Sequence, residues 1–281
     1  MKSKISLFAG FDALVAEIGL DKAAELLHSL GFSGVELSLS LNNIPPISVA
    51  KEYASVMRAH DLSIPCISCY APLVNRDQPV SVNTDTVEAL KRGVDFVHAV
   101  GSKYFHHTVY VDLTYPLPHP YQKVCDTAIV GALEVARYAA SKEVTILYEP
   151  QGYYFNGKEG FLRFFNEMSR LADNVAICLD VGNPLWVDDD VIEIVRAAKD
   201  KIAHVHIKDY RFSESGDGRT VGGRQILEVP TADGEIPIAK AVELITESGY
   251  DGFFSIEDNT DISIADKFSR ISDIINKHGS I

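Results

Sequence analysis

The chain has 281 residues, close to the ~250 of one (β/α)8 barrel. Hydrophobic residues make up 46% of it and charged residues 23%, a globular composition with ample material for a core. The formal net charge of −13 repels phosphate backbones, so nucleic acid is not an expected partner. The sequence has no apolar run of ~18 residues, no signal-peptide core and few cysteines. These features predict a cytoplasmic protein without a membrane partner.

Short apolar segments alternate with amphipathic helical patterns along the whole chain. The predicted strands cover residues 5–8, 35–38, 63–69, 103–107, 145–149, 176–180, 202–207 and 253–257. The predicted helices lie near 21–30, 48–60, 86–100, 120–142, 158–172, 188–199, 237–247 and 264–276. Because each helix returns the chain to the start of the next strand, this order predicts a parallel sheet. Eight such units favour an α/β fold, a (β/α)8 TIM barrel forming a single domain over residues 1–281; an open doubly wound sheet is the alternative.

Residues of metal-binding type end the last predicted strands, where a barrel carries its catalytic groups. They are Glu149, Asp180, His206 and Glu257. Side chains alternate between the two faces of a strand, and these residues share the face that carries the smaller or more polar side chains. If that face is the barrel interior, the four converge on an oxygen-rich site with one imidazole. Such a site suits one divalent ion (Mn²⁺, Mg²⁺ or Zn²⁺) with open positions for substrate. A set of solvated strand ends is the alternative.

Several short motifs at predicted strand ends occur in a characteristic order. They are Gly34-Val-Glu-Leu37, Tyr148-Glu-Pro-Gln-Gly152, Leu179-Asp-Val-Gly-Asn183, His204-Val-His-Ile-Lys-Asp209 and Ser255-Ile-Glu257. In these motifs the chain resembles the xylose isomerase-like TIM-barrel superfamily of sugar isomerases, epimerases and dehydratases, which also includes apurinic endonucleases. The resemblance covers most of the chain. It implies that Glu149, Asp180, His206 and Glu257 bind the metal ion.

Departures from the superfamily's patterns narrow the choice of branch. The endonuclease branch has His three positions after the strand-6 Asp, where this chain has Asn183. Together with the net charge of −13, this disfavours an apurinic endonuclease. The ketose 3-epimerase branch has the same His and a further Glu after strand 5, where Tyr153-Tyr154-Phe155 stands here. The resemblance therefore does not select a typical ketose 3-epimerase.

The ligand set predicts chemistry on a keto-sugar or polyol that chelates the ion through two adjacent oxygens. The metal acidifies the C–H next to the carbonyl and stabilises the resulting enediolate. Glu149 and Glu257 are the predicted acid–base pair, one on each side of the substrate. We therefore predict a metal-dependent isomerase or epimerase. The alternative is a dehydratase (lyase) of a keto-inositol or dehydroshikimate-like acid. A sugar-binding barrel without activity is less favoured, and a homo-oligomer is compatible with the sequence.

Further residues are predicted to contact the substrate, namely His107, Asn183, Trp186 and Lys208. Lys208 is two residues after His206, so it shares the inward face and lies at the carboxyl end of the strand. There it can stabilise enolate charge or hold a phosphate. His107 ends strand 4 and is expected to contact a hydroxyl, with His106 as the alternative inward-facing residue. Trp186 can stack on a sugar ring.

Two histidines in strand 7 share one face but differ in depth. A strand rises ~3.3 Å per residue, so His204 lies about 6–7 Å below His206. Only His206 is expected to reach the metal, while His204 is expected to be a core or supporting group. The glycine-rich segment 216–223 is predicted to be a mobile lid over the site.

Overall fold

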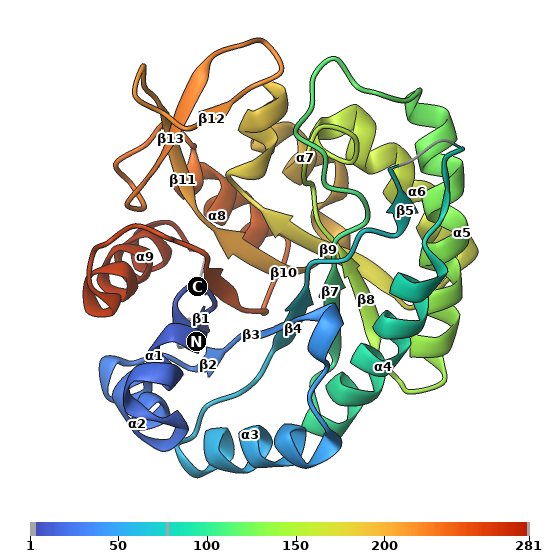
Figure 1. Cartoon of the computed structure of the whole chain (residues 1–281). Helices are drawn as coiled ribbons and strands as arrows, with labels where there is room; N and C mark the ends of the chain where they lie inside the picture. Colours follow the sequence, from blue (N-terminus) through green and yellow to red (C-terminus); the bar gives the residue numbers. More distant parts are fainter. Residues whose placement is uncertain (1–3, 77–78, 280–281) are drawn as a thin grey trace.

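A computed structural model of the chain describes residues 4–76 and 79–279. Its central feature is a sheet of parallel strands surrounded by helices (Figure 1). The strands are β1 (Ile5–Leu7), β2 (Gly34–Val35), β3 (Leu37–Leu39), β4 (Cys66–Cys69), β7 (Tyr104–His107), β8 (Thr145–Tyr148), β9 (Val175–Asp180), β10 (Ile202–Ile207) and β14 (Phe254–Ile256). They lie in the order β2-β1-β14-β10-β9-β8-β7-β4-β3.

The sheet closes into a barrel at Glu36. This residue separates β2 from β3; β2 pairs with β1, and β3 pairs with β4. The two edge pieces are thus one strand interrupted by one residue, and counting them together leaves eight strands at the predicted positions. The predicted (β/α)8 TIM barrel is confirmed.

The predicted helices are present and connect successive strands on the outside of the barrel (Figure 1). They are α2 (Leu20–Leu30), α3 (Ile47–Ala59), α4 (Thr84–Val100), α5 (Tyr121–Ala140), α6 (Leu162–Leu171), α7 (Val191–Ala198), α8 (Ile238–Glu247) and α9 (Ile264–His278). Within the described residues, no helix is both long and apolar enough to cross a bilayer.

Side-chain caps fix where several helices begin. The side chain of Asn83 accepts a hydrogen bond from the backbone N–H of Thr86, and Ser263 does the same for Asp266. Such caps satisfy backbone N–H groups that have no partner within the helix. At the other end of α4, Gly101 adopts a left-handed φ of +82° that ends the helix.

Other elements were not predicted from the sequence. They are α1 (Phe11–Ile18), the antiparallel pair β5 (Val74–Asn75) and β6 (Ser81–Val82), the single-turn helices η1 (Leu41–Asn43), η3 (Asn183–Val187) and η4 (Lys199–Lys201), and a small sheet of β11 (Asp209–Phe212), β12 (Gly218–Arg219) and β13 (Gln225–Val229). The start of the helix predicted at 158–172 is a π-helical turn, η2 (Gly157–Phe161). The small sheet, here called the flap, is antiparallel and follows β10 (orange in Figure 1). The predicted lid at 216–223 lies within it.

The strands have two different apolar faces. Ile146, Ile177 and Val205 belong to the large core that also contains the buried helix side chains. Leu147 and Cys178, at neighbouring positions of the same strands, pack in a separate small cluster on the barrel interior. The predicted alternation is therefore present, and it points Glu149, Asp180 and His206 into the barrel at the carboxyl ends of the strands.

Candidate active site

The four residues predicted to bind a metal lie together at the carboxyl ends of the strands. One ligand atom from each of Glu149, Asp180, His206 and Glu257 lies within 4.8 Å of the others. His206 Nδ1 is 2.8 Å from Glu149 Oε1 and 3.0 Å from Glu257 Oε2. The Glu257 side chain is 18% exposed, whereas the Asp180 side chain is fully buried. The group therefore opens toward solvent on the side of Glu257.

The turn after β9 orients Asp180. The backbone N–H groups of Gly182 and Asn183 donate to its Oδ1 at 2.8 and 2.6 Å. Its other oxygen, Oδ2, is 3.1 Å from Lys208 Nζ. A Cβ at position 182 would lie 2.7 Å from Lys208 Cγ, so only glycine lets the lysine approach this closely. One Asp180 oxygen is thus fixed by the backbone while the other faces the site.

Lys208 is the cation within this group of carboxylates. Its Nζ lies 2.8 Å from Glu257 Oε1 and its side chain is 7% exposed. Burial opposes the charged form of the lysine, but Asp180 and Glu257 outweigh it and raise the Lys208 pKa well above its ordinary value. Burial likewise opposes ionisation of Glu257, but Lys208 and His206 outweigh it and lower the Glu257 pKa. Both groups are therefore ionised at neutral pH.

This donor set fits a divalent cation. Three carboxylates and one imidazole converge from four different strand ends, and each contributes a ligand atom. Oxygen-rich sets with one imidazole suit Mg²⁺ or Mn²⁺ and are also found around Zn²⁺. A bound cation also compensates the negative charge that these carboxylates bring into the barrel.

His106, rather than His107, faces the site. His107 is fully buried on the helix side, where its ring packs edge-on against Tyr148 and its Nδ1 bonds to the Thr108 carbonyl. His106 points inward, with its ring edge-on to His206 and its Nε2 3.6 Å from Glu149 Oε2. The structure therefore does not bring His107 to the ligands, because strand alternation places its neighbour there.

The hydrogen bonds of Ser68 set the tautomer of His106. Ser68 Oγ donates its one proton to Glu36, because a carboxylate can only accept. Ser68 Oγ must then accept from His106 Nδ1, 2.8 Å away. Burial lowers the His106 pKa, which favours the neutral ring. His106 Nε2 is therefore a buried acceptor next to Glu149 to which no described residue donates a hydrogen bond.

Asn183 and Trp186 lie on η3, directly after β9. Asn183 is buried, and its Nδ2 has no hydrogen-bond partner among the described residues. That free donor is available to a substrate oxygen. Trp186 packs edge-on against Tyr210, and its ring lies 2.8 Å from the place of a Cβ on Gly218. We had expected the Trp186 ring to stack on a sugar. In the structure it packs against the flap.

Glu36 is a buried residue beneath the candidate ligands to which the sequence interpretation assigned no role. It is 1% exposed, and its carboxylate contacts both histidines of β10. Its sequence signals are its place in the Gly34–Leu37 motif and its charge inside the predicted strand 35–38, but neither assigned it a role. A buried carboxylate in a strand needs donors from elsewhere in the fold, and sequence does not reveal them.

Comparisons with known proteins agree with this architecture. A family model described as "Xylose isomerase-like TIM barrel" matches residues 24–274. An inosose dehydratase of Geobacillus thermodenitrificans is 25% identical over an alignment of 201 residues. The match covers 66% of this chain and 66% of that protein, so the chain spans just under two thirds of its length.

Solved structures share the fold over the whole chain. The IolI protein with a bound zinc atom has a TM-score of 0.76 at 18% identity, covering 99% of this chain and 100% of that chain. The 3-keto-D-glucoside 4-epimerase YcjR of E. coli has a TM-score of 0.74 at 14% identity, covering 98% and 99%. At these identities the likeness shows the shared fold.

Proposed function

This chain belongs to the xylose isomerase-like TIM barrel family, and on that premise we propose that it is a divalent-metal-dependent isomerase or epimerase of a keto-sugar or polyol. The observation that carries this proposal is the placement of Glu149 and Glu257. They follow β8 and β14, which β9 and β10 separate, yet both carboxylates reach His206 Nδ1. Two carboxylates thus face one prospective metal position from different sides of the barrel mouth.

In the proposed reaction, Glu257 and Glu149 share the two proton transfers, one to each residue. When bound, a divalent ion supplies Lewis acidity that weakens the C–H bond next to a substrate carbonyl. Each Glu has two oxygens, so one can hold the ion while the other moves a proton. Glu257, ionised and partly exposed, can remove the proton from the substrate carbon. Glu149 can then return a proton to the opposite face or to the neighbouring carbon.

Three further side chains support substrate binding. The Lys208 ammonium, 2.8 Å from Glu257 Oε1, lies where it can stabilise negative charge on a substrate oxygen. His106 Nε2 offers an acceptor for a substrate hydroxyl, and Asn183 Nδ2 offers a donor. This mixture of partners suits a polyol, whose hydroxyls both donate and accept.

A second candidate is a dehydratase that acts on a keto-inositol or a similar ring. The observation in its favour is the likeness to inosose dehydratases at 25% and 26% identity. The same site supports it: one carboxylate removes the proton and the other protonates a departing β-hydroxyl.

The decisive experiment is an NMR assay of keto-polyols in deuterated water, with Mg²⁺, Mn²⁺ or Zn²⁺ supplied in turn. We expect deuterium at the carbon next to the carbonyl and a new epimer or isomer, with no loss of water. A new deoxy or vinyl signal selects the dehydratase. Absence of both exchange and product from the whole panel contradicts the proposal. Chelated enzyme is the control.

A further inference from the structure

Glu36 lies between β2 and β3, where the pairing of the chain passes from β1 to β4, and its backbone N–H still donates to the Leu7 carbonyl at 2.8 Å. Its carboxylate lies inside the barrel beneath the candidate metal ligands and is closed off from solvent. His204 Nε2 donates to its Oε2 at 2.7 Å, and Ser68 Oγ donates to its Oε1. His206 Nε2 lies 3.0 and 3.1 Å from the two oxygens. Three donors thus hold one buried carboxylate in place.

We propose that Glu36 is a positioning residue that fixes the ring orientation and the tautomer of His206 for metal binding. This inference rests on the metal centre of the proposed function. A carboxylate only accepts hydrogen bonds, so His206 Nε2 must carry a proton. In the structure Nδ1 also faces carboxylates, at 2.8 Å from Glu149 Oε1 and 3.0 Å from Glu257 Oε2, and donates to them. A cation that takes the place of the Nδ1 proton would leave the Nε2 proton hydrogen-bonded to Glu36, and the ring would then bind through Nδ1. Without Glu36, the ring can place its proton on either nitrogen.

The carboxylate also affects how well His206 binds a cation. Hydrogen bonding from a metal-binding imidazole to a carboxylate raises the basicity of the imidazole, and its loss costs 10–100-fold in metal affinity. His204 takes part indirectly, because its bond to Oε2 anchors the carboxylate from below. The two histidines of β10 therefore have different tasks: one binds, and the other holds the group that orients the binder.

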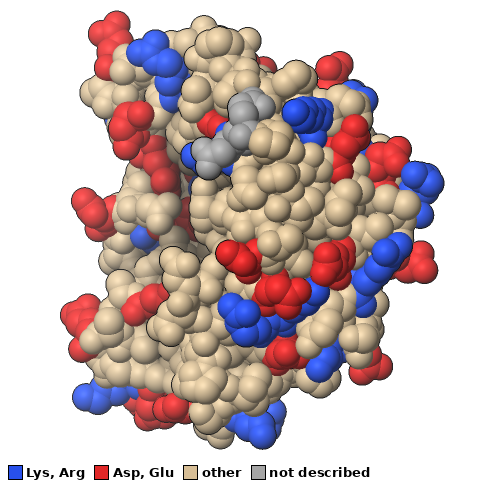
Figure 2. Space-filling model, turned by 45° about the vertical axis from the view of Figure 1, so that its right-hand side comes forward, with Lys and Arg blue, Asp and Glu red and all other residues tan. Residues whose placement is uncertain are grey.

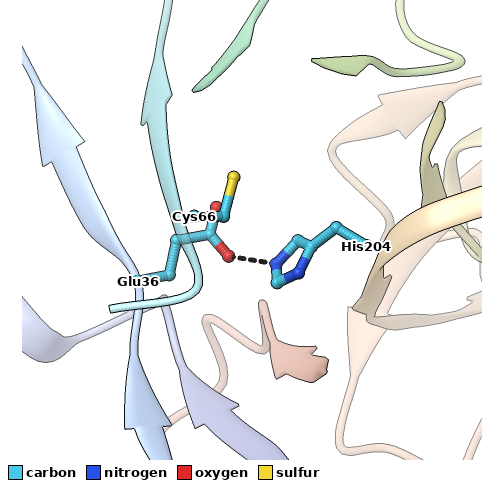
Figure 3. Close-up of side chains that lie close together, drawn as sticks. All are labelled: Glu36, Cys66 and His204. Carbon is cyan, nitrogen blue, oxygen red and sulfur yellow. Dashed lines mark hydrogen bonds and ion pairs between the residues drawn. The ribbon is translucent and has the colours of Figure 1, made fainter. Parts of the chain in front are cut away.

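Glu36, Cys66 and His204 lie close enough together to suggest a second metal site. Figure 3 shows these three side chains. The dashed line marks the hydrogen bond between Glu36 and His204, and no such line reaches Cys66. Both Glu36 oxygens already accept hydrogen bonds, and burial raises the Cys66 pKa well above its ordinary value, so the thiol stays protonated. We therefore assign Glu36 to hydrogen bonding.

The test compares Glu36→Gln with Cys66→Ala, a control in the same buried cluster that has no hydrogen bond to a candidate ligand. Zinc affinity is measured by competition with a chelator. Glu36→Gln is expected to weaken zinc binding by about 10–100-fold. Cys66→Ala is expected to leave affinity within about twofold while lowering the melting temperature.

A second measurement is made by NMR on the wild-type protein itself, so it does not require that the variant folds or that a substrate is turned over. In zinc-loaded, 15N-labelled wild-type protein, the His206 ring should show a slowly exchanging proton on Nε2. In Glu36→Gln that signal should shift or broaden. The inference is overturned if the zinc-loaded wild type carries its His206 proton on Nδ1. It is also overturned if a folded Glu36→Gln variant keeps the zinc affinity of the wild type, or if the protein binds a second ion that Cys66→Ala removes. Since no readout uses a substrate, inactivity on every sugar refutes the proposed function and leaves this inference standing.

Discussion

At the scale of single residues, the site consists of charged groups held in place by their protein neighbours. Asp180 is oriented by two backbone amides, His206 contacts three carboxylates, and Lys208 joins Asp180 to Glu257. Low exposure strengthens these contacts, so loss of one partner leaves the others uncompensated. Substitutions here should therefore change the stability of the fold as well as its function.

Replacing Glu149 or Glu257 with Gln tests the acid–base pair. Each change keeps the shape of the side chain but removes proton transfer, so turnover should fall by at least ~10²-fold, the low end for a lost general acid or base. Metal content is measured alongside, because either variant can also bind the ion more weakly. The acid–base assignment is wrong if both variants keep the metal and a near-normal rate.

Replacing His206 or His204 with Ala separates the ligand from its support. His206→Ala should lose metal affinity and activity while the barrel stays folded, because Nδ1 faces the other ligands. His204→Ala should mainly lower stability, with a smaller effect on affinity, because it acts through Glu36. Metal titration and thermal melts of both variants provide the measurement. The reverse pattern would falsify the placement of the ligand set on β10.

Replacing His107 with Gln tests a pH effect on stability. Burial lowers the His107 pKa to about 4, whereas an unfolded His titrates near ~6.5. Between these values the unfolded state binds more protons, so this histidine destabilises the fold as pH falls from about 6.5 to about 4. Relative to wild type, His107→Gln should gain about 2 kcal/mol in unfolding free energy between pH 7.5 and 4.5. Urea denaturation at both pH values measures this gain, and a constant difference contradicts the prediction.

At the scale of elements, the loop before α8 is tied to the end of β10 by Asp209. Its carboxylate accepts backbone N–H bonds from Tyr210, Ala232, Gly234 and Ile236. The same loop reaches the strand end next to Glu257, since the Thr231 N–H donates to Asp258. Asp209 therefore connects the flap, the loop and one side of the candidate site.

Asp209→Ala should lower the free energy of unfolding by about 3 kcal/mol, because four backbone N–H groups, one buried and three part-buried, lose their acceptor at once. The matched control is Asp190→Ala, which removes the cap on Ile192 N–H at the start of α7 and should cost about 1 kcal/mol. Denaturant unfolding of both variants measures the difference. An equal loss in the two contradicts the role assigned to Asp209.

At the scale of the whole molecule, the candidate site gathers negatively charged groups inside the barrel, whereas the face drawn in Figure 2 mixes both signs of charge. On the face drawn in Figure 2, Lys and Arg side chains lie among Asp and Glu rather than forming one basic patch. The strand ends, in contrast, collect three carboxylates around one imidazole. A cation that binds there stabilises the native barrel, because the ligands are brought together only by folding.

Adding and removing a divalent ion should therefore shift the melting temperature. At a free ion concentration of 100 Kd, binding adds about 2.7 kcal/mol of stability. For a chain of this size that corresponds to a rise of about 5–10 °C. Thermal melts with Mg²⁺, Mn²⁺ or Zn²⁺, and again after chelation, provide the measurement. Asp180→Asn should abolish most of the shift, and an equal shift in that variant places the bound ion elsewhere.

Features that repeat locally could be predicted from the order of residues along the chain. The alternation of strand and helix predicts the barrel, and two-residue periodicity identified the inward faces of β8, β9 and β10 together with their terminal Glu149, Asp180 and His206. These inferences were possible because periodicity and strand-to-helix order depend only on neighbours in the chain.

Contacts between side chains that are distant in the chain could not be predicted in this way and depend on the folded barrel. The tertiary structure turned His106 inward instead of His107, and it brought Glu36 across the barrel to His204 and His206. It also formed the flap over 209–229, of which the sequence had indicated only a lid at 216–223. These outcomes depend on where each strand breaks and on its register against partners up to 170 residues away. The free energy of that register comes from contacts across the whole barrel, so no local pattern records it.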